Sequence, residues 1–119
     1  GKWVRYEGVP TLMDRLRATY AKGSEESLDS LLFWYYSHNL LLLDDLGAEK
    51  SNDGADGYVA EQITKIWDNY PWWLVISTNK TQREMAAKLG DRLASRLYST
   101  NPDLDDMVLV VNTAKDYRA

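Results

Sequence analysis

The sequence predicts an α/β fold built on a mostly parallel sheet. Short apolar runs alternate along the chain with amphipathic helical patterns, and glycine, proline and capping residues mark the boundaries between them. The run Leu40–Asp44 shows no polar alternation, which is typical of a strand buried on both faces. Strands that alternate with helices in this way favour parallel pairing through helical crossovers.

The first half of the chain is predicted to form a strand, two helices and a second strand. Residues 3–7 alternate in polarity, Gly8-Val9-Pro10 should break that strand, and Thr11 with Asp14 resembles a capping box that opens a helix. A helix ended by Gly23 and a second helix from about Ser24 should follow. Their expected buried stripes are Leu12, Met13, Leu16 and Tyr20, then Leu28, Leu31, Leu32 and Tyr35.

The second half repeats the alternation. After a polar loop over 48–57, a helix ended by Pro71 precedes a buried strand over 73–77. Thr81 and Glu84 form a capping box for a short helix ended by Gly90, and Asp91 can cap another. A loop over 101–106, a strand over 107–111 and a polar tail complete the chain. The expected inward residues of the three helices are Val59, Ile63, Ile66 and Tyr70, then Met85 and Leu89, then Leu93 and Leu97.

Composition narrows the class of protein. The 119 residues suffice for one domain, and the absence of cysteine excludes disulfides and thiolate metal sites. No apolar run approaches the roughly 20 residues of a membrane span, and no signal peptide is visible, so the cytoplasm is the expected location. The net charge of -4 includes nine acids and one base between residues 23 and 61, which argues against a broad nucleic-acid surface.

Asp44 and Asp45 are the first candidate site residues. They follow the leucine run at the carboxyl end of a predicted strand, where open α/β sheets bind ligands. Adjacent acids there can divide two tasks of phosphoryl transfer to water, because one can hold a cation and the other can orient the attacking water. The alternative is a structural pair of turn or capping aspartates.

Asn79, Arg92 and Arg96 are further candidates. Asn79 ends the strand after the acid pair and can hold a water or a phosphate oxygen, although asparagine is also common in turns. Arg92 and Arg96 project from one side of a helix, where an arginine can reach a neighbour's nucleotide or can pair with Asp91 or Glu84. Arg118 follows the last strand and can reach a phosphate or belong to a frayed tail.

Four segments in this order resemble the AAA+ ATPases of the DnaC/DnaI helicase-loader group, to which the IstB-like transposition helpers are closely related. The segments are Leu-Leu-Leu-Leu-Asp-Asp-Leu-Gly-Ala-Glu from residue 40, Ile-Ser-Thr-Asn from 76, Leu-Gly-Asp-Arg-Leu-Ala-Ser-Arg-Leu from 89 and Asp-Tyr-Arg from 116. The resemblance extends over essentially the whole chain, residues 1–119, as one partial AAA+ domain.

The resemblance implies a role for each of these residues. Asp44 is similar to the Walker B metal acid, Asp45 to the catalytic acid and Asn79 to sensor 1. Arg96 is similar to the arginine finger that acts in trans, and Arg118 to the sensor 2 arginine. Arg92 is a further nucleotide-binding candidate in the same box as Arg96, and candidates for contact with single-stranded DNA in the first two helices are Arg15, Arg17 and Lys22.

The implied fold is a three-layer P-loop NTPase sheet of the AAA+ type that lacks its first strand and phosphate loop, which should precede residue 1. In the family strand order 5-1-4-3-2 the missing strand is central, so we expect the remaining strands to pair anew, to borrow a strand or to be unstable. The implied cofactors are ATP and Mg²⁺, and tight binding of ATP by this chain alone is not expected.

The resemblance to this family, together with the missing first strand and phosphate loop, leaves three possible functions. The leading one is a DnaC-like, ATP-dependent loader of the replicative helicase that acts on single-stranded DNA and self-associates through its ATPase interface. The first alternative is an IstB-like transposition helper. The second alternative is a degenerate, non-catalytic module that pairs with a partner through an exposed sheet edge.

Overall fold

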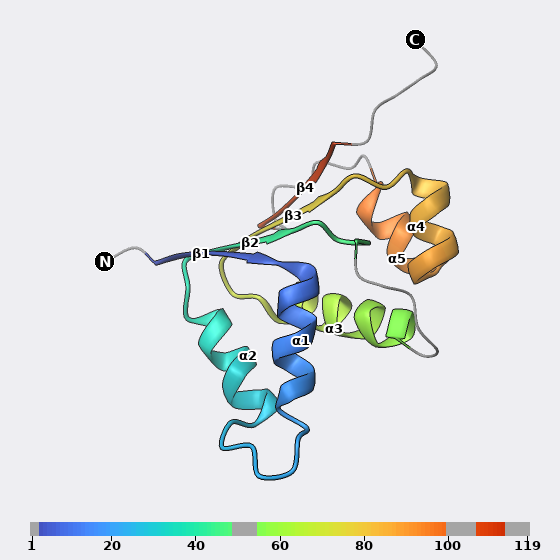
Figure 1. Ribbon diagram of the computed structural model, residues 1–119. Coiled ribbons are helices and arrows are strands. Elements are labelled where there is room, and N and C mark those ends of the chain that lie inside the picture. Colours follow the sequence, from blue (N-terminus) through green and yellow to red (C-terminus); the bar gives the residue numbers. More distant parts are fainter. Residues whose placement is uncertain (1–2, 49–54, 100–106, 114–119) are drawn as a thin grey trace.

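A four-stranded parallel sheet covered by five helices forms the described part of the protein. The computed structural model describes residues 3–48, 55–99 and 107–113. The elements run in the order β1 Val4–Gly8, α1 Val9–Ala18, α2 Leu28–Tyr36, β2 Leu40–Asp44, α3 Ala55–Asn69, β3 Trp73–Thr78, α4 Gln82–Leu89, α5 Asp91–Leu97 and β4 Val108–Asn112 (Figure 1). The α/β class and the parallel sheet predicted from the sequence are confirmed.

The strands lie side by side in chain order, β1-β2-β3-β4. Val4 pairs with Leu40, and Leu40 pairs with Trp73, so the first three strands begin level with one another. The fourth strand lies directly on the third, from Leu74 opposite Val108 to Thr78 opposite Asn112. Of the three outcomes expected for a sheet without its central strand, the structure shows new pairing between the remaining strands.

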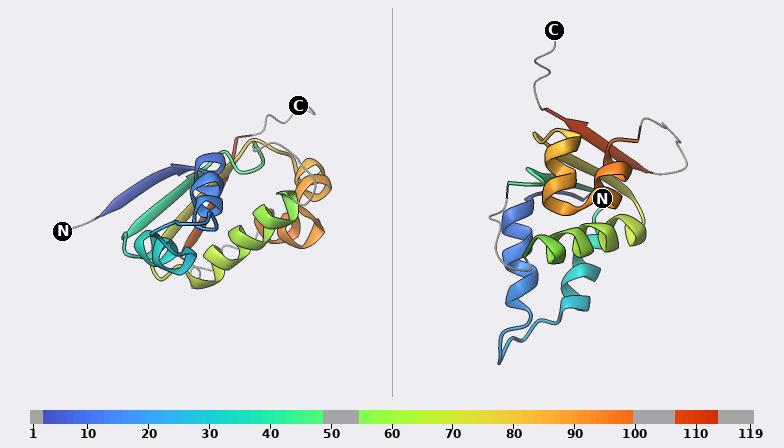
Figure 2. Two further views of the ribbon diagram at one scale, coloured as in Figure 1. Left: turned by 60° about the horizontal axis from the view of Figure 1, so that its bottom comes forward. Right: turned by 90° about the vertical axis from the view of Figure 1, so that its right-hand side faces the viewer.

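The core lies between the sheet and the helices, on one face of the sheet. Along β2 and β3 every second side chain is buried, as in β2, where Leu41 and Leu43 are fully buried and their neighbours are partly exposed. The buried apolar residues of all five helices belong to the same cluster as these leucines. Figure 2 shows the helices gathered on that side of the strands, so the described residues form two of the three expected layers.

The first helix begins earlier than the sequence pattern indicated, and the second begins later. Gly8 ends β1 and is at once the N-cap of α1, and Pro10 lies in the first turn, where a missing N–H costs nothing. The capping box expected at Thr11 is therefore wrong, because that residue lies inside the helix and no side chain caps it. The helix ends at Ala18, so Tyr20 lies beyond it and is 59% exposed.

The start of α2 is also corrected. Ser27, and not Ser24, is the N-cap, because its hydroxyl accepts a hydrogen bond of 3.1 Å from the backbone N–H of Ser30. Further along, Thr81 and Glu84 form both hydrogen bonds of the predicted capping box. Asp91 is the first residue of α5 instead of its cap. Its negative charge lies in the first turn, where it interacts favourably with the positive end of the helix dipole.

Candidate functional site

The carboxyl edge of the sheet carries a tight turn that we call the acid turn, residues 44–47. Asp44 is the last residue of β2, and Asp45 takes the left-handed conformation with φ 65°. This conformation is uncommon for residues other than glycine, although aspartate tolerates it better than most. Asp44 thus ends the extended strand, and the backbone reverses its course at Asp45.

Hydrogen bonds to β3 hold the acid turn in place. The backbone N–H of Leu46 donates to the carbonyl of Ser77 at 2.9 Å, and the hydroxyl of Thr78 donates to the carbonyl of Leu46 at 2.7 Å. The backbone N–H of Asp45 also donates to the Ser77 hydroxyl at 3.3 Å. Because Thr78 is fully buried, its bond is shielded from water, and the turn is fixed relative to the end of β3.

Asp44 is held ionised by two hydroxyl groups. The hydroxyls of Ser77 and Tyr6 both donate to its carboxylate, and these bonds lower the pKa of Asp44 below its usual value. The same contact raises the pKa of the Tyr6 phenol, because a neighbouring carboxylate favours the protonated phenol. Asp44 therefore presents a negative charge at the edge of the sheet across the physiological pH range.

Gly47 and Lys80 make the acid turn compact. Gly47 has φ 97°, and a Cβ built on it would lie 2.9 Å from Cγ of Lys80, so the lysine side chain crosses directly over the glycine. The backbone carbonyl of Lys80 accepts a hydrogen bond of 3.2 Å from the side-chain amide of Asn112 and another from the Tyr98 hydroxyl. The turn after β3 is thus fixed from β4 and from the end of α5.

Asn79 occupies the expected position beside the acid turn. It follows the last residue of β3, and its side chain is exposed at the same sheet edge as Asp44 and Asp45. A cavity of 440 Å³ lies nearby, between α3 and α4, and is lined by Asp56, Lys80, Glu84, Ala87 and Lys88. Neither aspartate of the acid turn lines this cavity, and within the turn Asp45 is exposed whereas Leu46 and Gly47 are buried.

Arg96 lies away from the acid turn. Its guanidinium pairs with the carboxylate of Asp68 at 2.7 Å and stacks on the ring of Trp67, with 4.2 Å from Cζ to the ring centroid. Both partners belong to the last turn of α3, and the pairs with Asp91 or Glu84 named as alternatives do not form. Arg92 is exposed on α5, and Arg118 lies outside the described residues.

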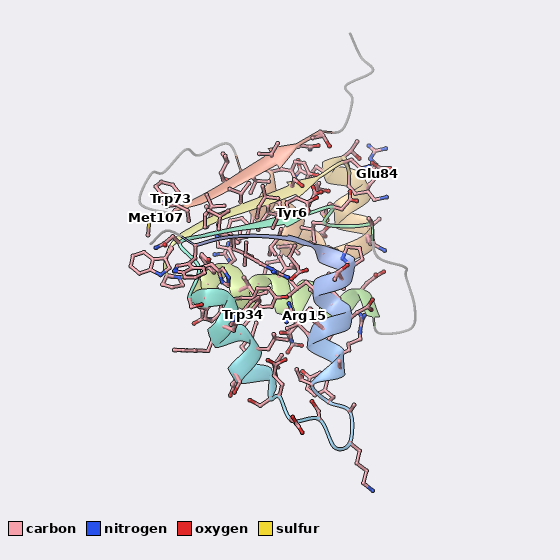
Figure 3. All side chains as sticks on the ribbon, turned by 60° about the vertical axis from the view of Figure 1, so that its left-hand side comes forward. Tyr6, Arg15, Trp34, Trp73, Glu84 and Met107 are labelled. Atoms are coloured by element: carbon pink, nitrogen blue, oxygen red, sulfur yellow. The ribbon has the colours of Figure 1, made fainter. Side chains whose placement is uncertain are left out.

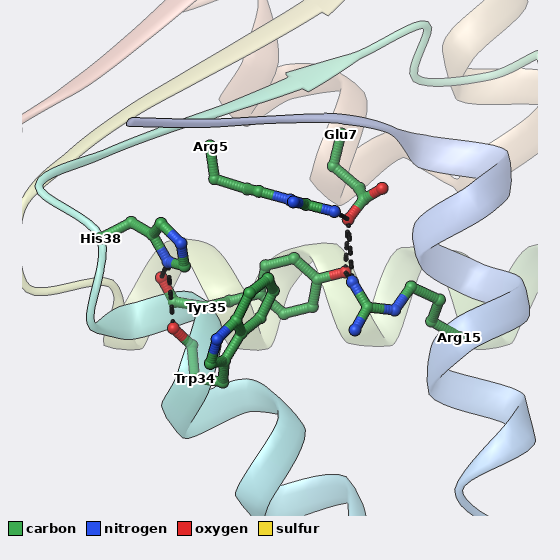
Figure 4. A network of polar contacts seen from close by, with 6 residues as sticks. All are labelled: Arg5, Glu7, Arg15, Trp34, Tyr35 and His38. Carbon is green, nitrogen blue, oxygen red and sulfur yellow. Dashed lines mark hydrogen bonds and ion pairs between the residues drawn. The ribbon is translucent and has the colours of Figure 1, made fainter. Parts of the chain in front are cut away.

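The buried carboxylate of Glu7 contacts side chains of both α1 and α2 (Figure 4). Glu7 is 6% exposed and accepts hydrogen bonds from the Tyr35 hydroxyl at 2.6 Å and from Arg5 and Arg15 at 3.2 and 3.3 Å. Burial, followed by the bond to Glu7, raises the pKa of Tyr35. Both guanidiniums also lie 5.1 Å from the ring of Trp34. This network neutralises Glu7 and fixes α2 against α1.

The three DNA-contact candidates differ in their surroundings. Arg15 belongs to the Glu7 network, so part of its charge is neutralised inside the protein. Arg17 makes a long ion pair of 3.9 Å with the exposed Asp14 and stacks on Tyr58. Lys22 is exposed in the loop between α1 and α2. The structure therefore leaves Arg17 and Lys22 more accessible than Arg15.

The sequence did not single out Tyr6 or Ser77 as site residues. Ser77 carried a weak signal as part of the polar triplet at the end of β3, and Tyr6 carried none beyond its place in an alternating strand. Both reach Asp44 from neighbouring strands through the sheet register, which no local pattern reveals. Among the described residues, no group of three or more histidine, cysteine, aspartate or glutamate side chains is placed to hold a metal ion.

Comparison with known structures shows that this fold has been seen before. The chain is similar to the crystal structure of the DnaC helicase loader, with a TM-score of 0.62 and 23% sequence identity. The similarity covers 91% of this chain and 60% of that chain, so these residues span less than two thirds of its length. No protein-family model and no curated protein matches the sequence. The shared feature is therefore the fold, an α/β arrangement like that of DnaC.

No helix in the described part of the chain is long and apolar enough to cross a membrane.

Proposed function

We propose that these 119 residues provide the metal-and-water side of the nucleotide site in a DnaC-like, ATP-dependent loader of the replicative helicase, acting in the cytoplasm. One observation supports the proposal: Asp44, whose pKa is lowered, Asp45 and Asn79 stand at the ends of two neighbouring strands, on the carboxyl edge of a sheet whose fold is similar to that of a DnaC loader. In open α/β sheets this edge is where ligands bind.

The residues of the acid turn divide the chemistry between them. Asp44 stays charged at neutral pH and would hold the cation. Asp45 would orient the attacking water, while the Asn79 amide would hold that water or a phosphate oxygen. The hydrogen bond that the Asp45 N–H donates to Ser77, and the one that Thr78 donates to the Leu46 carbonyl, keep this arrangement fixed, so little reorganisation is needed during the reaction.

Mg²⁺ and ATP fit the acid turn as a partial site. Mg²⁺ is usually bound through one or two carboxylates together with substrate phosphates and waters, and Asp44 would supply one such carboxylate. When bound, the ion neutralises phosphate charge and lowers the barrier to phosphoryl transfer. The sequence contains no phosphate loop of the G-x-x-x-x-G-K-[ST] type, so the proposal assigns cradling of the phosphates to residues outside this chain.

Three arginines are proposed to complete the nucleotide site, in the roles that the resemblance to AAA+ ATPases implies. Arg96 is half-exposed on α5, and in this proposal it leaves Asp68 to reach the nucleotide of a neighbouring subunit. Arg92 on the same helix and Arg118 beyond β4 are proposed to contact phosphates. An exposed ion pair of this kind is weak, so the exchange of Asp68 for a phosphate costs little.

Single-stranded DNA and the helicase are the proposed partners. Arg17 and Lys22 offer exposed positive charge on and after α1, which suits contact with a phosphate backbone, and Arg15 supports this surface from within the Glu7 network. The overall net charge of -4 restricts such contact to a local surface.

A non-catalytic interaction module is the second candidate, and one observation favours it. The strand β4 pairs directly with β3 over five residue pairs, so the described sheet is continuous without a central strand between them. This candidate predicts that neutralising Asp45 changes nothing measurable.

The test compares ATP hydrolysis and ATP binding in a protein that contains this chain together with a phosphate loop. Asp45→Asn should reduce hydrolysis by about 100-fold or more with ATP binding retained, because the water is no longer oriented. The matched control is Asp14→Asn on α1, an acid that is 83% exposed and lies in the helical region outside the acid turn. Equal hydrolysis by Asp45→Asn and the control would favour the non-catalytic module.

A further inference from the structure

Two arginines of the Glu7 network carry more charge than Glu7 can balance. Arg5 and Arg15 each donate a hydrogen bond to the same carboxylate oxygen, Oε2, which also accepts one from the Tyr35 hydroxyl (Figure 4). One carboxylate therefore meets two guanidiniums, and the cluster has a surplus of one positive charge. We call Arg5 and Arg15 the arginine pair.

The arginine pair keeps hydrogen-bond donors that have no acceptor. A guanidinium presents several N–H groups in one plane. Arg5 uses only Nη2, and Arg15 uses only Nη1, which donates to Glu7 and to the Tyr35 oxygen. The Nε of Arg5 is buried and has no partner among the described residues. Because a buried donor without an acceptor is costly, this nitrogen indicates that an acceptor from outside the described residues belongs here.

Trp34 holds the two guanidiniums in place. The Cζ atoms of Arg5 and Arg15 both lie 5.1 Å from the centre of its ring, which is within the range of a cation–π contact. The ring is itself packed against the ring of Tyr35, with 5.0 Å between centroids, and against that of His38 at 4.7 Å. The arginine pair is thus oriented before a ligand arrives, which lowers the entropic cost of binding.

Both guanidiniums are partly accessible on the side of the sheet that the helices cover. The side chains of Arg5 and Arg15 are 37% and 36% exposed, whereas that of Glu7 is 7% exposed. Figure 3 shows Arg15 and Trp34 together with the helices. The strand β1 is the first in the sheet order, away from the central position expected for the missing strand. The arginine pair therefore lies apart from the sheet face that these residues leave uncovered.

We propose that the arginine pair binds a phosphate group. The planar fork of a guanidinium matches phosphate oxygens, and a phosphate has enough oxygens to accept from Nε of Arg5 and from the nitrogens of Arg15 that Glu7 leaves unused. The surplus positive charge favours an anion over a neutral ligand. The proposal does not rest on the ATPase function, because this site shares no residue with the acid turn and requires no hydrolysis.

The first test titrates the 119-residue chain with inorganic phosphate at constant ionic strength. NMR follows the Nε–Hε signal of Arg5 and the indole N–H signal of Trp34. Both should shift and saturate with a dissociation constant on the order of 1 mM, because Glu7 offsets part of the positive charge. Sulfate should compete with phosphate, since it has the same tetrahedral shape, whereas chloride should not. Shifts that do not saturate, or that chloride reproduces, would overturn the proposal.

Variants separate recognition by the arginine pair from general attraction of anions. Arg5→Gln and Arg15→Gln should each weaken phosphate binding at least about tenfold, because each removes a charged donor. The matched control is Arg83→Gln, which changes an exposed arginine of α4 outside the Glu7 network and should leave binding unchanged. Arg5→Lys keeps the charge beside Glu7 but lacks the planar fork and Nε, so it should still weaken binding about fivefold or more. Circular dichroism checks the fold, and Arg5→Lys remains the test if Arg5→Gln does not fold.

A second titration distinguishes two sources of the phosphate group, a nucleic-acid backbone and a free phosphate ion. A short single-stranded DNA oligonucleotide that binds at least about tenfold more tightly than inorganic phosphate, and is weakened by Arg5→Lys, would assign the backbone. Equal affinities, both weakened by Arg5→Lys, would assign the free ion. If Arg5→Lys binds phosphate as well as the wild-type chain does, or if Arg83→Gln weakens binding as much as Arg5→Gln, the arginine pair is not the site.

Discussion

Replacement of Gly47 by alanine should destabilise the protein for two separable reasons. The first is backbone conformation, since Gly47 has φ 97° and an L-residue pays roughly 1–2 kcal/mol there. The second is contact, since the new Cβ would lie 2.9 Å from Cγ of Lys80 and the lysine must move. Displacing a packed side chain costs on the order of 1 kcal/mol, so the expected total is about 2–3 kcal/mol.

Gly23 provides a matched control for this prediction. It also has a positive φ, of 84°, but a Cβ there would meet no atom within 4 Å, so Gly23→Ala should lose only the conformational part. Urea unfolding with an unchanged m-value measures both changes. Adding Lys80→Ala should bring the loss from Gly47→Ala down to that of the control. An equal loss from both glycine variants without that addition would refute the packing of Lys80 over the acid turn.

Two further predictions concern the acid turn, and a third concerns the ion pair of Arg96. Thr78→Val removes the buried donor to the acid turn and should cost about 1–3 kcal/mol in urea unfolding, whereas Thr78→Ser should cost less; equal losses would contradict the role of the hydroxyl. The lowered pKa of Asp44 stabilises the fold above its usual value of 3.8, and this stabilisation is lost as the pH falls through the lowered value. Tyr6→Phe should therefore raise the Asp44 titration midpoint seen by NMR, and an unmoved midpoint would contradict the contact. Asp68→Asn should cost less than about 1 kcal/mol in urea unfolding, because Arg96 is partly exposed, and a larger loss would make the pair structural.

The strands around the site were predictable because their signals are local. The leucine run of β2 and the apolar run of β3 have no polar alternation, and both strands lie where the sequence placed them. The capping box of α4 was predictable for the same reason, since it depends on two side chains three residues apart. The acid turn follows from the first of these strands, and so its position at the sheet edge was also foreseen.

Other features depend on context that local patterns lack. Pro10 both ends a strand and suits the first turn of a helix, so the sequence alone did not place the start of α1. The hydroxyls of Tyr6 and Ser77 meet Asp44 only because three strands align in one register. The pairing of Arg96 with Asp68 joins residues of two helices that no periodicity relates.

Isothermal titration of the 119-residue chain with Mg-ATP tests the central claim most directly. The claim is that the acid turn offers the metal-and-water side of a nucleotide site and that the phosphate-binding side lies outside these residues. We predict no binding in the micromolar range, because two carboxylates and an amide cannot hold a triphosphate without a cradle of backbone N–H groups. A micromolar dissociation constant would contradict the claim, because these residues would then contain a complete site.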